Sequence, residues 1–218
     1  MELFTVIAVI AILIGIAYPA FTSVMERARK TQAKNDLTQI VTAVNGYYTE
    51  YGKYPLTTGT DVTFTGATAG TTSGSSNAAL IDVLRDNTTS AVNAATVTTW
   101  NPRGIVFIQP PLAKDQTGPK SGIKNSTGIW YDPWGSPYNV AIDGNYNNVV
   151  VAPTYTDLAT TYTTAAAPNA DVGVPVGVIS WAFGKNGVLG GGAPAAGFTN
   201  EPGTAGNFSG SGDVISWQ

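Results

Sequence analysis

The most constraining feature of this sequence is a stretch without charge at its N-terminal end. No charged residue lies between Glu2 and Glu26, and the segment 3–21 is apolar with four exceptions, namely Thr5, Gly15, Tyr18 and Pro19. A helix of about 20 apolar residues spans a bilayer. Hydration of the large side chains in this segment would cost on the order of 20 kcal/mol. The segment must therefore lie in lipid or against other protein.

Two simple interpretations compete with an assembly role for this segment. A signal peptide would begin with basic residues and end at a small-residue cleavage site, whereas this segment opens with Glu2 and continues into a long polar helix. A plain single-span anchor stays open, because the apolar run alone does not exclude it.

Glu2 argues against a plain anchor. A carboxylate at the end of an apolar helix costs about 2 to 3 kcal/mol in lipid unless a cation neutralises it. The nearest bases of the chain, Arg27, Arg29 and Lys30, lie a full membrane span away. The α-amino group of a neighbouring copy is the economical partner, so we predict that Glu2 is a subunit-assembly residue.

From Glu26 onward, apolar residues recur at steps of three and four, which is typical of a helix with one buried face. This stripe comprises Ala33, Leu37, Ile40, Val41, Val44, Tyr47, Tyr48 and Tyr51. Gly52 and Pro55 are expected to end the helix. We expect one continuous helix whose stripe, tyrosines included, forms part of the core under a head.

After Pro55 the chain becomes rich in Thr, Gly, Ala, Ser and Asn, and the segment 57–76 is interpreted as a surface loop or insertion. The spacing of apolar residues predicts a short helix over 77–87. Short runs rich in β-branched or aromatic residues predict four strands, at Gly104–Ile108, Tyr138–Ile142, Asn148–Val151 and Val178–Phe183.

One long helix laid across a small antiparallel sheet gives the α+β fold class. Three segments are expected: a hydrophobic transmembrane or filament-core helix over 1–25, its amphipathic continuation over 26–55, and a globular head with Gly/Thr-rich loops over 56–218.

The amino-acid composition excludes several classes of function. Charged residues make up 11% of the chain and the net charge is -3, so there is no basic footprint for nucleic acid. The chain has no Cys and no His, which removes thiol chemistry, the commonest general base and the usual soft-metal ligands. No pair of carboxylates has a spacing that indicates acid/base catalysis. We expect that the protein is not an enzyme.

The string MELFTVIAVIAILIGIAYPAF, with ERARKTQAKNDLTQIVTAVNGYYTEYGKYP after it, resembles the N-terminal stem of type IV pilins and type II secretion pseudopilins. The resemblance covers residues 1–55 and rests on the early acid, the spacing from Glu2 to Pro19, the basic cluster, the QAKND segment, the paired tyrosines and the YP ending. In that family the mature chain begins a few residues before the glutamate. About three residues and a leader are therefore expected to precede this sequence.

The resemblance implies roles for three stem residues within a pilin fold. Glu2 would pair with the N-methylated terminal amine of an adjacent subunit, and the stem would bend or unwind at Pro19 in filaments. A proline removes one helical hydrogen bond and clashes with the preceding turn, which gives the bend a cause. The family's glycine eight residues before the proline is Ala11 here, while Gly15 lies closer. An unwound stretch is thus expected at Gly15–Pro19.

The DPWGSPY, WAFGKNG and GDVISW segments resemble the major, G-type pseudopilin of type II secretion. In such pseudopilins Ca²⁺ holds the loop after the last strand. The resemblance places Asn186 where a loop aspartate often lies and matches Asp213 to an aspartate just before the end of the chain. Glu201 is a further oxygen donor that this loop offers. Hard cations need six to eight oxygens. The alternative is a loop closed by hydrogen bonds and by packing of Trp181 and Trp217.

The leading function is thus the major structural subunit of an extracellular type IV pilus-like filament, serving adhesion, motility or DNA uptake. The alternative is the major pseudopilin of a periplasmic type II secretion pseudopilus. Both imply a helical homo-oligomer, an inner-membrane stage before assembly, and a dedicated assembly machinery as partner. A membrane-anchored enzyme is a third class. The bases after the span would place the head in the cytoplasm by the positive-inside tendency, but the family has the opposite orientation, which we adopt.

Overall fold

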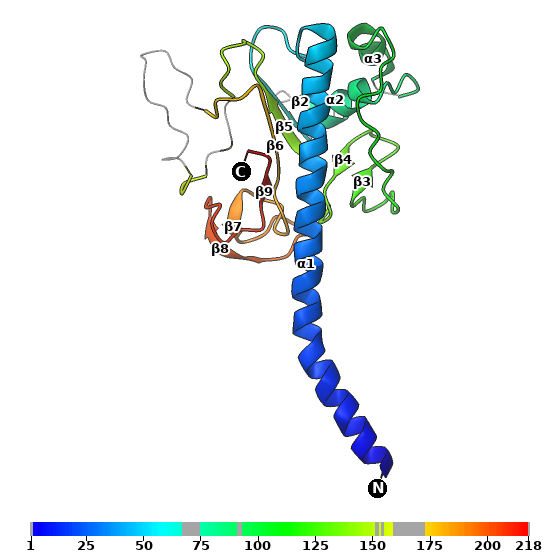
Figure 1. Ribbon diagram of the computed structural model, residues 1–218, viewed down its shortest axis with the longest axis vertical. Helices are drawn as coiled ribbons and strands as arrows, with labels where there is room; N and C mark the ends of the chain where they lie inside the picture. The colour runs from blue at the N-terminus through cyan, green and yellow to red at the C-terminus, as the bar shows by residue number, and fades with distance from the viewer. Residues whose placement is uncertain are drawn as a thin grey trace.

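The computed structural model describes residues 2–66, 75–90, 93–150, 153, 155–158 and 173–217. A long helix, α1 (Glu2–Tyr51), carries a head along its C-terminal half, while its N-terminal half projects alone (Figure 1). Two further helices are α2 (Asn77–Leu84) and α3 (Ala94–Trp100). The described strands are β1 (Val62–Thr65), β2 (Ser75–Ser76), β3 (Gly122–Ile123), β4 (Trp130–Tyr131), β5 (Asn139–Ile142), β6 (Val178–Ala182), β7 (Gly190–Gly192), β8 (Glu201–Ala205) and β9 (Val214–Ile215). The α+β class predicted from the sequence is confirmed.

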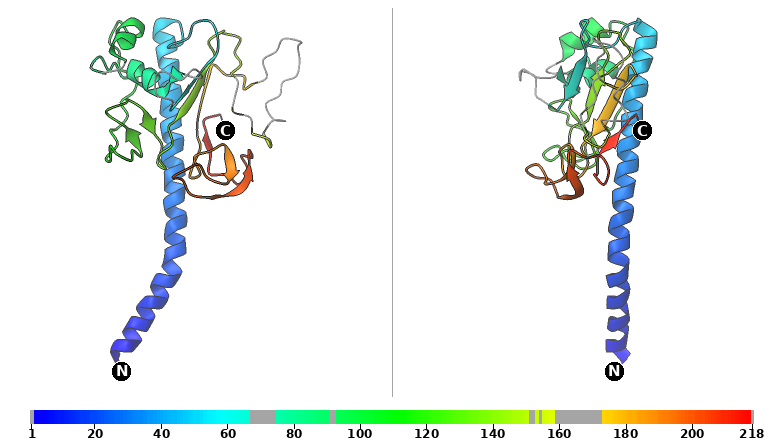
Figure 2. Two further views of the ribbon diagram at one scale, coloured as in Figure 1. Left: turned by 180° about the vertical axis from the view of Figure 1, so that it is seen from behind. Right: turned by 90° about the vertical axis from the view of Figure 1, so that its left-hand side faces the viewer.

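Helix α1 is continuous, as the sequence predicts. Its backbone stays helical through 15–19, so the unwinding expected for assembled subunits is not seen in this single chain. The N-terminal part, dark blue in Figures 1 and 2, is inclined relative to the rest of the helix. Gly52 ends the helix in the left-handed region, at φ 67°, and its amide donates to the Tyr48 carbonyl at 2.8 Å.

The apolar stripe of α1 packs under the head as predicted. Its fully or almost fully buried members are Ala33, Leu37, Ile40, Val44 and Tyr47. Val41 and Tyr51 are partly buried at its edges. The expectation that all the stripe tyrosines lie in the core is wrong for Tyr48, which is 39% exposed and stacks on Tyr54 with ring centroids 4.6 Å apart. The sheet contacts a narrower face of the helix than the stripe covers.

The main sheet has five strands in the order β2-β1-β5-β6-β9. The β1–β2 pair is parallel and the other three pairs are antiparallel. The strands β6 and β9 lie against α1, with the sheet on one side of the helix (Figure 2, right). The predicted strands at Tyr138–Ile142 and Val178–Phe183 are confirmed as β5 and β6, and the predicted short helix as α2.

Three predictions in the head need correction. Gly104–Ile108 is not a strand: the amides of Phe107 and Ile108 donate to the Leu84 carbonyl at the end of α2, so the segment is clamped to a helix and not to the sheet. Asn148–Val151 forms only an isolated bridge between Val150 and Val174 within the described residues; Val151 lies outside them.

The segment 57–76 is not entirely loop, which is the third correction. It contains β1, which pairs with β5, and β2. Phe64 is completely buried in the main core, and Val62 packs against it. Pairing with a distant strand stabilises β1. Helix α3 was not predicted; its Thr-rich sequence has low helix propensity, and burial of Val97 holds it in place.

The C-terminal lobe consists of the antiparallel β7–β8 pair and the loops around it, next to β9 (Figure 1). A second core cluster, separate from the one under α1, includes Tyr155, Ile179, Trp181 and Ile215. The rings of Trp181 and Trp217 meet edge to face with centroids 6.4 Å apart, which agrees with the predicted packing of these two residues.

Candidate functional site

The exposed half of α1 is the first candidate site. Its large apolar side chains are not covered by the described part of the head: Phe4 is 74% exposed and Ile16 is 70% exposed. Within the described part of the chain, α1 is the one helix long and apolar enough to cross a membrane, with a mean hydropathy of 2.5 in a window of which nothing is buried. A contiguous apolar surface of this size marks contact with lipid or with protein.

The predicted assembly residues lie on this half. The side chains of Glu2 and Pro19 lie outside the described residues, so the pairing of Glu2 and the bend at Pro19 stay predictions. At Gly15, an added Cβ would meet nothing within 4 Å. The packing of the described chain therefore does not require glycine there.

The second candidate site is the C-terminal loop, where the structure brings Asn186, Glu201 and Asp213 together. The Glu201 carboxylate accepts the backbone amides of Asn186 and Gly212 from two sides of the loop. Asp213 Oδ2 accepts the Gly190 amide at 2.7 Å, and Asn186 Nδ2 donates to the Gly190 carbonyl at 2.6 Å. These three side chains close the loop.

The electrostatics of this loop depend on Asp213. Burial raises the pKa of Asp213 to about 7, while hydrogen bonds from the Gly190 amide and the Tyr155 hydroxyl favour the ionised form and the charge of Glu201 opposes it. Tyr155 donates to Asp213 Oδ2 at 2.8 Å. The second oxygen, Oδ1, is buried and has no hydrogen-bond partner among the described residues. A protonated or cation-bound carboxyl group would suit this position.

The donor set fits calcium only in part. Asp213 Oδ1 has spare capacity, but both oxygens of Glu201 accept backbone amides and Asn186 Oδ1 accepts the Val188 amide at 3.1 Å. Across the described residues, no group of three or more His, Cys, Asp or Glu side chains is arranged to hold a metal ion. This arrangement matches the alternative of a loop closed by hydrogen bonds, and calcium stays a prediction.

The DPWGSPY turn is a third candidate site and a second polar centre, predicted only as a turn. Asp132 Oδ1 accepts the amides of Trp134, Gly135 and Ser136 at 2.7 to 2.9 Å. Burial raises the pKa of Asp132 to about 7 against these hydrogen bonds. The turn also contacts the stem, because Trp134 Nε1 donates to Glu26 Oε2 at 3.0 Å. It fixes the head to α1 at the lower end of their contact.

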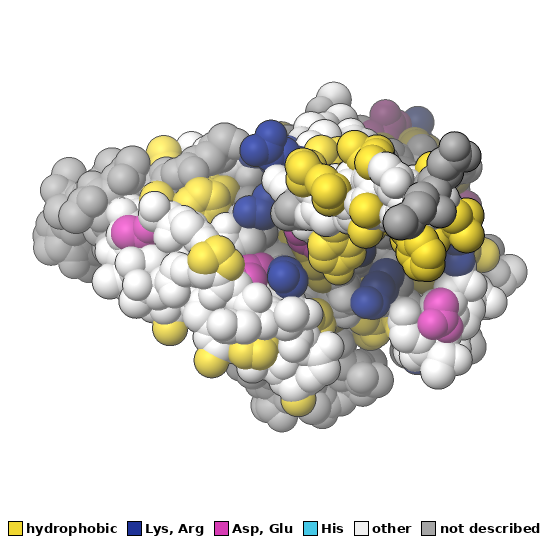
Figure 3. All heavy atoms as spheres, turned by 90° about the horizontal axis from the view of Figure 1, so that it is seen from below, with side chains coloured by type: hydrophobic (Ala, Val, Ile, Leu, Met, Phe, Trp, Pro, Cys, Tyr) yellow, Lys and Arg dark blue, Asp and Glu magenta, His cyan; other side chains and the backbone are white. Residues whose placement is uncertain are grey.

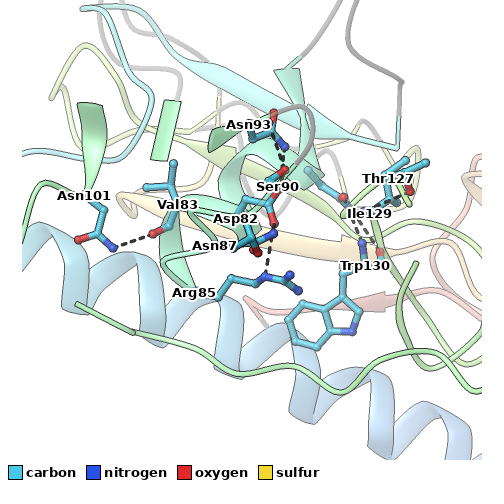
Figure 4. Close-up of polar contacts among 12 residues, drawn as sticks. Asp82, Val83, Arg85, Asn87, Ser90, Asn93, Asn101, Thr127, Ile129 and Trp130 are labelled. Carbon is cyan, nitrogen blue, oxygen red and sulfur yellow. Dashed lines mark hydrogen bonds and ion pairs between the residues drawn. The ribbon is translucent and has the colours of Figure 1, made fainter. Parts of the chain in front are cut away.

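A third polar centre surrounds Asp82 of α2 (Figure 4). The completely buried carboxylate accepts hydrogen bonds from Asn87, Ser90 and Asn93 at 2.8 to 2.9 Å and pairs with Arg85 at 3.3 Å. All four partners come from the end of α2 and the chain that follows it. The cluster therefore ties this segment to α2, a role that the sequence did not indicate.

Comparisons of the chain with protein-family models, with curated proteins and with solved structures find no match.

Proposed function

We propose that this chain is the major structural subunit of an extracellular type IV pilus-like filament, with a pilin fold that assembles through α1. The observation that carries the proposal is the exposed apolar segment Leu3–Phe21 on a head that has already completed its own core. Burial of this segment among copies would recover on the order of 20 kcal/mol per subunit.

Before assembly the segment spans the inner membrane, and afterwards it packs against the same segment of its neighbours in the filament core. Glu2 then faces the N-methylated terminal amine of an adjacent subunit, which neutralises its charge in an apolar surrounding. Local unwinding at Gly15–Pro19 would let the stems follow the filament axis. The buried carboxylates of the head serve loop closure, and we assign no catalysis to them.

Substitution of Glu2 tests this function. We expect Glu2→Ala to abolish filaments in negative-stain electron microscopy while the protein still inserts into the membrane. Glu50→Ala, at the opposite end of the same helix and paired with Arg103 on the surface, is the matched control and should assemble normally. Filaments from Glu2→Ala, or none from the unmodified full-length chain, would contradict the proposed function.

A type II secretion pseudopilus is the second candidate, favoured by the resemblance of the DPWGSPY turn and the C-terminal segments to G-type pseudopilins. The two candidates differ in location and in the phenotype of a deletion. Long surface appendages containing this protein favour the pilus, whereas blocked release of secreted proteins favours the pseudopilus. A membrane-anchored enzyme, in contrast, would retain its activity in Glu2→Ala.

A further inference from the structure

A groove of about 500 Å³ lies at the lower edge of the head, where the apolar run of α1 ends. Its walls include Phe21, Met25, Glu26 and Arg29 of α1 and Lys185 of the loop after β6. The groove borders the C-terminal polar loop at Lys185, whose backbone amide donates to Glu201. At its other end it includes Phe21, the last residue of the apolar segment.

The walls of this groove combine an apolar and a basic part. Phe21, Met25 and Arg29 recur at every fourth residue, so they share one face of the helix. Helical side chains tilt toward the N-terminus of their helix, and the Arg29 side chain is therefore directed toward the apolar segment. A ligand in this groove would contact the apolar side chains of Phe21 and Met25 at the lower end and the positive charge of Arg29 above them.

Among the described residues, Glu26 is the one acidic group that lines the groove, and both of its carboxylate oxygens are engaged. Glu26 Oε1 pairs with Arg29 Nη1 at 2.7 Å, and Glu26 Oε2 accepts the Trp134 indole N–H. The Arg29 side chain is still 43% exposed, and a guanidinium has further N–H donors. Viewed from below, several basic side chains surround the yellow apolar stem in projection (Figure 3).

The position of the groove along the helix axis matches that of the lipid headgroups in a bilayer. The apolar run 3–21 is about 28 Å long as a helix, close to the hydrocarbon thickness of a bilayer. Arg29 lies about 12 Å further along the axis, and its long side chain reaches back toward the membrane surface. Thr22 and Ser23, which also line the groove, mark the polar boundary.

We propose that this groove binds the headgroup of an anionic phospholipid while the subunit is in the membrane. Arg29 and Lys185 contact the phosphate, and Phe21 and Met25 contact the upper acyl chain. This site rests on the part of the proposed function in which α1 spans a bilayer before assembly. A bound lipid would hold the head close to the membrane surface, with the stem upright.

Native mass spectrometry of the full-length, unassembled chain in non-ionic detergent tests the site. We expect dioleoylphosphatidylglycerol to be retained in preference to dioleoylphosphatidylcholine. The double variant Arg29→Gln/Lys185→Gln should lose roughly 10- to 30-fold in affinity for the anionic lipid, since each base near such a surface contributes to attraction. Lys53→Gln, which removes a base at the far end of α1, is the control and should bind as the unmodified chain does.

Equal retention of the two lipids, or a double variant that binds like the control, would overturn the site. Displacement of the lipid by millimolar inorganic phosphate would also overturn it, because the apolar wall would then contribute nothing. So would a dimer that the double variant loses, since the groove would then hold a second copy. Filament formation is scored separately by microscopy. Lipid binding without filaments therefore refutes the proposed function alone, and filaments without lipid binding refute this site alone.

Discussion

Asp213 gives a prediction whose magnitude follows from the structure. Its carboxyl group has a pKa of about 7 in the folded chain, because burial disfavours the charge; in the unfolded chain the pKa lies near 3.8. Between about pH 4 and pH 7 the folded state therefore holds a proton that the unfolded state has released. Rising pH removes this proton from the folded state at a cost, so stability falls through this window and levels off above it.

The size of this change in stability is set by the difference between the pKa values of Asp213 in the folded and the unfolded chain. A difference of about three pKa units corresponds to about 4 kcal/mol. Asp213 lines an open groove between α1 and β9, and nearby solvent screens part of its charge, so we expect about 2 kcal/mol. Asp213→Asn keeps one oxygen to accept from Tyr155 and Gly190 but cannot ionise. The stability of the unmodified chain relative to this variant should fall by that amount between pH 4 and pH 8.

Urea denaturation in non-ionic detergent, followed by tryptophan fluorescence at several pH values, measures this difference. The comparison cancels the other titrating groups, such as Asp132, which both proteins share. A constant offset between the two proteins is expected, since the introduced amide lacks a partner for its N–H groups. A difference that stays constant from pH 4 to pH 8 would refute the assignment of a raised pKa to Asp213.

The same two proteins test the calcium prediction. Binding to the folded state alone stabilises it by an amount that grows with ligand concentration. If Asp213 Oδ1 is a calcium ligand, Ca²⁺ at pH 8 should raise the denaturation midpoint of the unmodified chain and leave Asp213→Asn unchanged. If Ca²⁺ does not change the denaturation midpoint of the unmodified chain, Asp213 is not a calcium ligand and the loop is closed by hydrogen bonds.

Two further predictions concern packing. Leu37→Ala should destabilise the chain by about 2 to 5 kcal/mol in urea denaturation, because Leu37 is completely buried between stem and head; exposed Thr38→Ala should change it by less than about 0.5 kcal/mol. Gly177→Ala should destabilise the chain by about 1 to 3 kcal/mol, since its Cβ would lie 1.9 Å from the Tyr54 hydroxyl oxygen. Gly46→Ala has room for a Cβ inside α1 and should stabilise the chain by up to about 1 kcal/mol. Equal effects within either pair would contradict the packing.

The sequence predicted the elements whose signal is local. The stripe through Leu37 and Val44 identified the buried face of α1, because helical periodicity is written in neighbouring residues. Strand β1 was missed, since its four residues become a strand through pairing with β5, far away in the chain. The clamp of Phe107 and Ile108 on α2 is likewise a long-range contact that β propensity does not encode.

The candidate site divides in the same way. Asn186 and Asp213 were indicated by the resemblance. In the structure both side chains form hydrogen bonds with the backbone of Gly190. The function of Glu201 as an acceptor for amides from two sides of the loop depends on tertiary placement and has no local signal. Composition gave no indication that Asp82 would be the centre of a buried cluster.

These carboxylates share one physical role. The chain has no cysteine and 25 glycines, so its long loops have no covalent closure and a large conformational entropy to lose. Asp132 and Glu201 each accept several backbone amides, and Asp157 accepts the amides of Phe208 and Ser209, both at 2.7 Å. A carboxylate has two oxygens and can accept hydrogen bonds from the backbone amides of loops that are not paired in a sheet. These bonds replace the hydrogen bonds that a neighbouring strand would otherwise supply. The head of this protein therefore uses carboxylates where a disulfide could otherwise close a loop, and the raised pKa of buried Asp132 makes its stability dependent on pH.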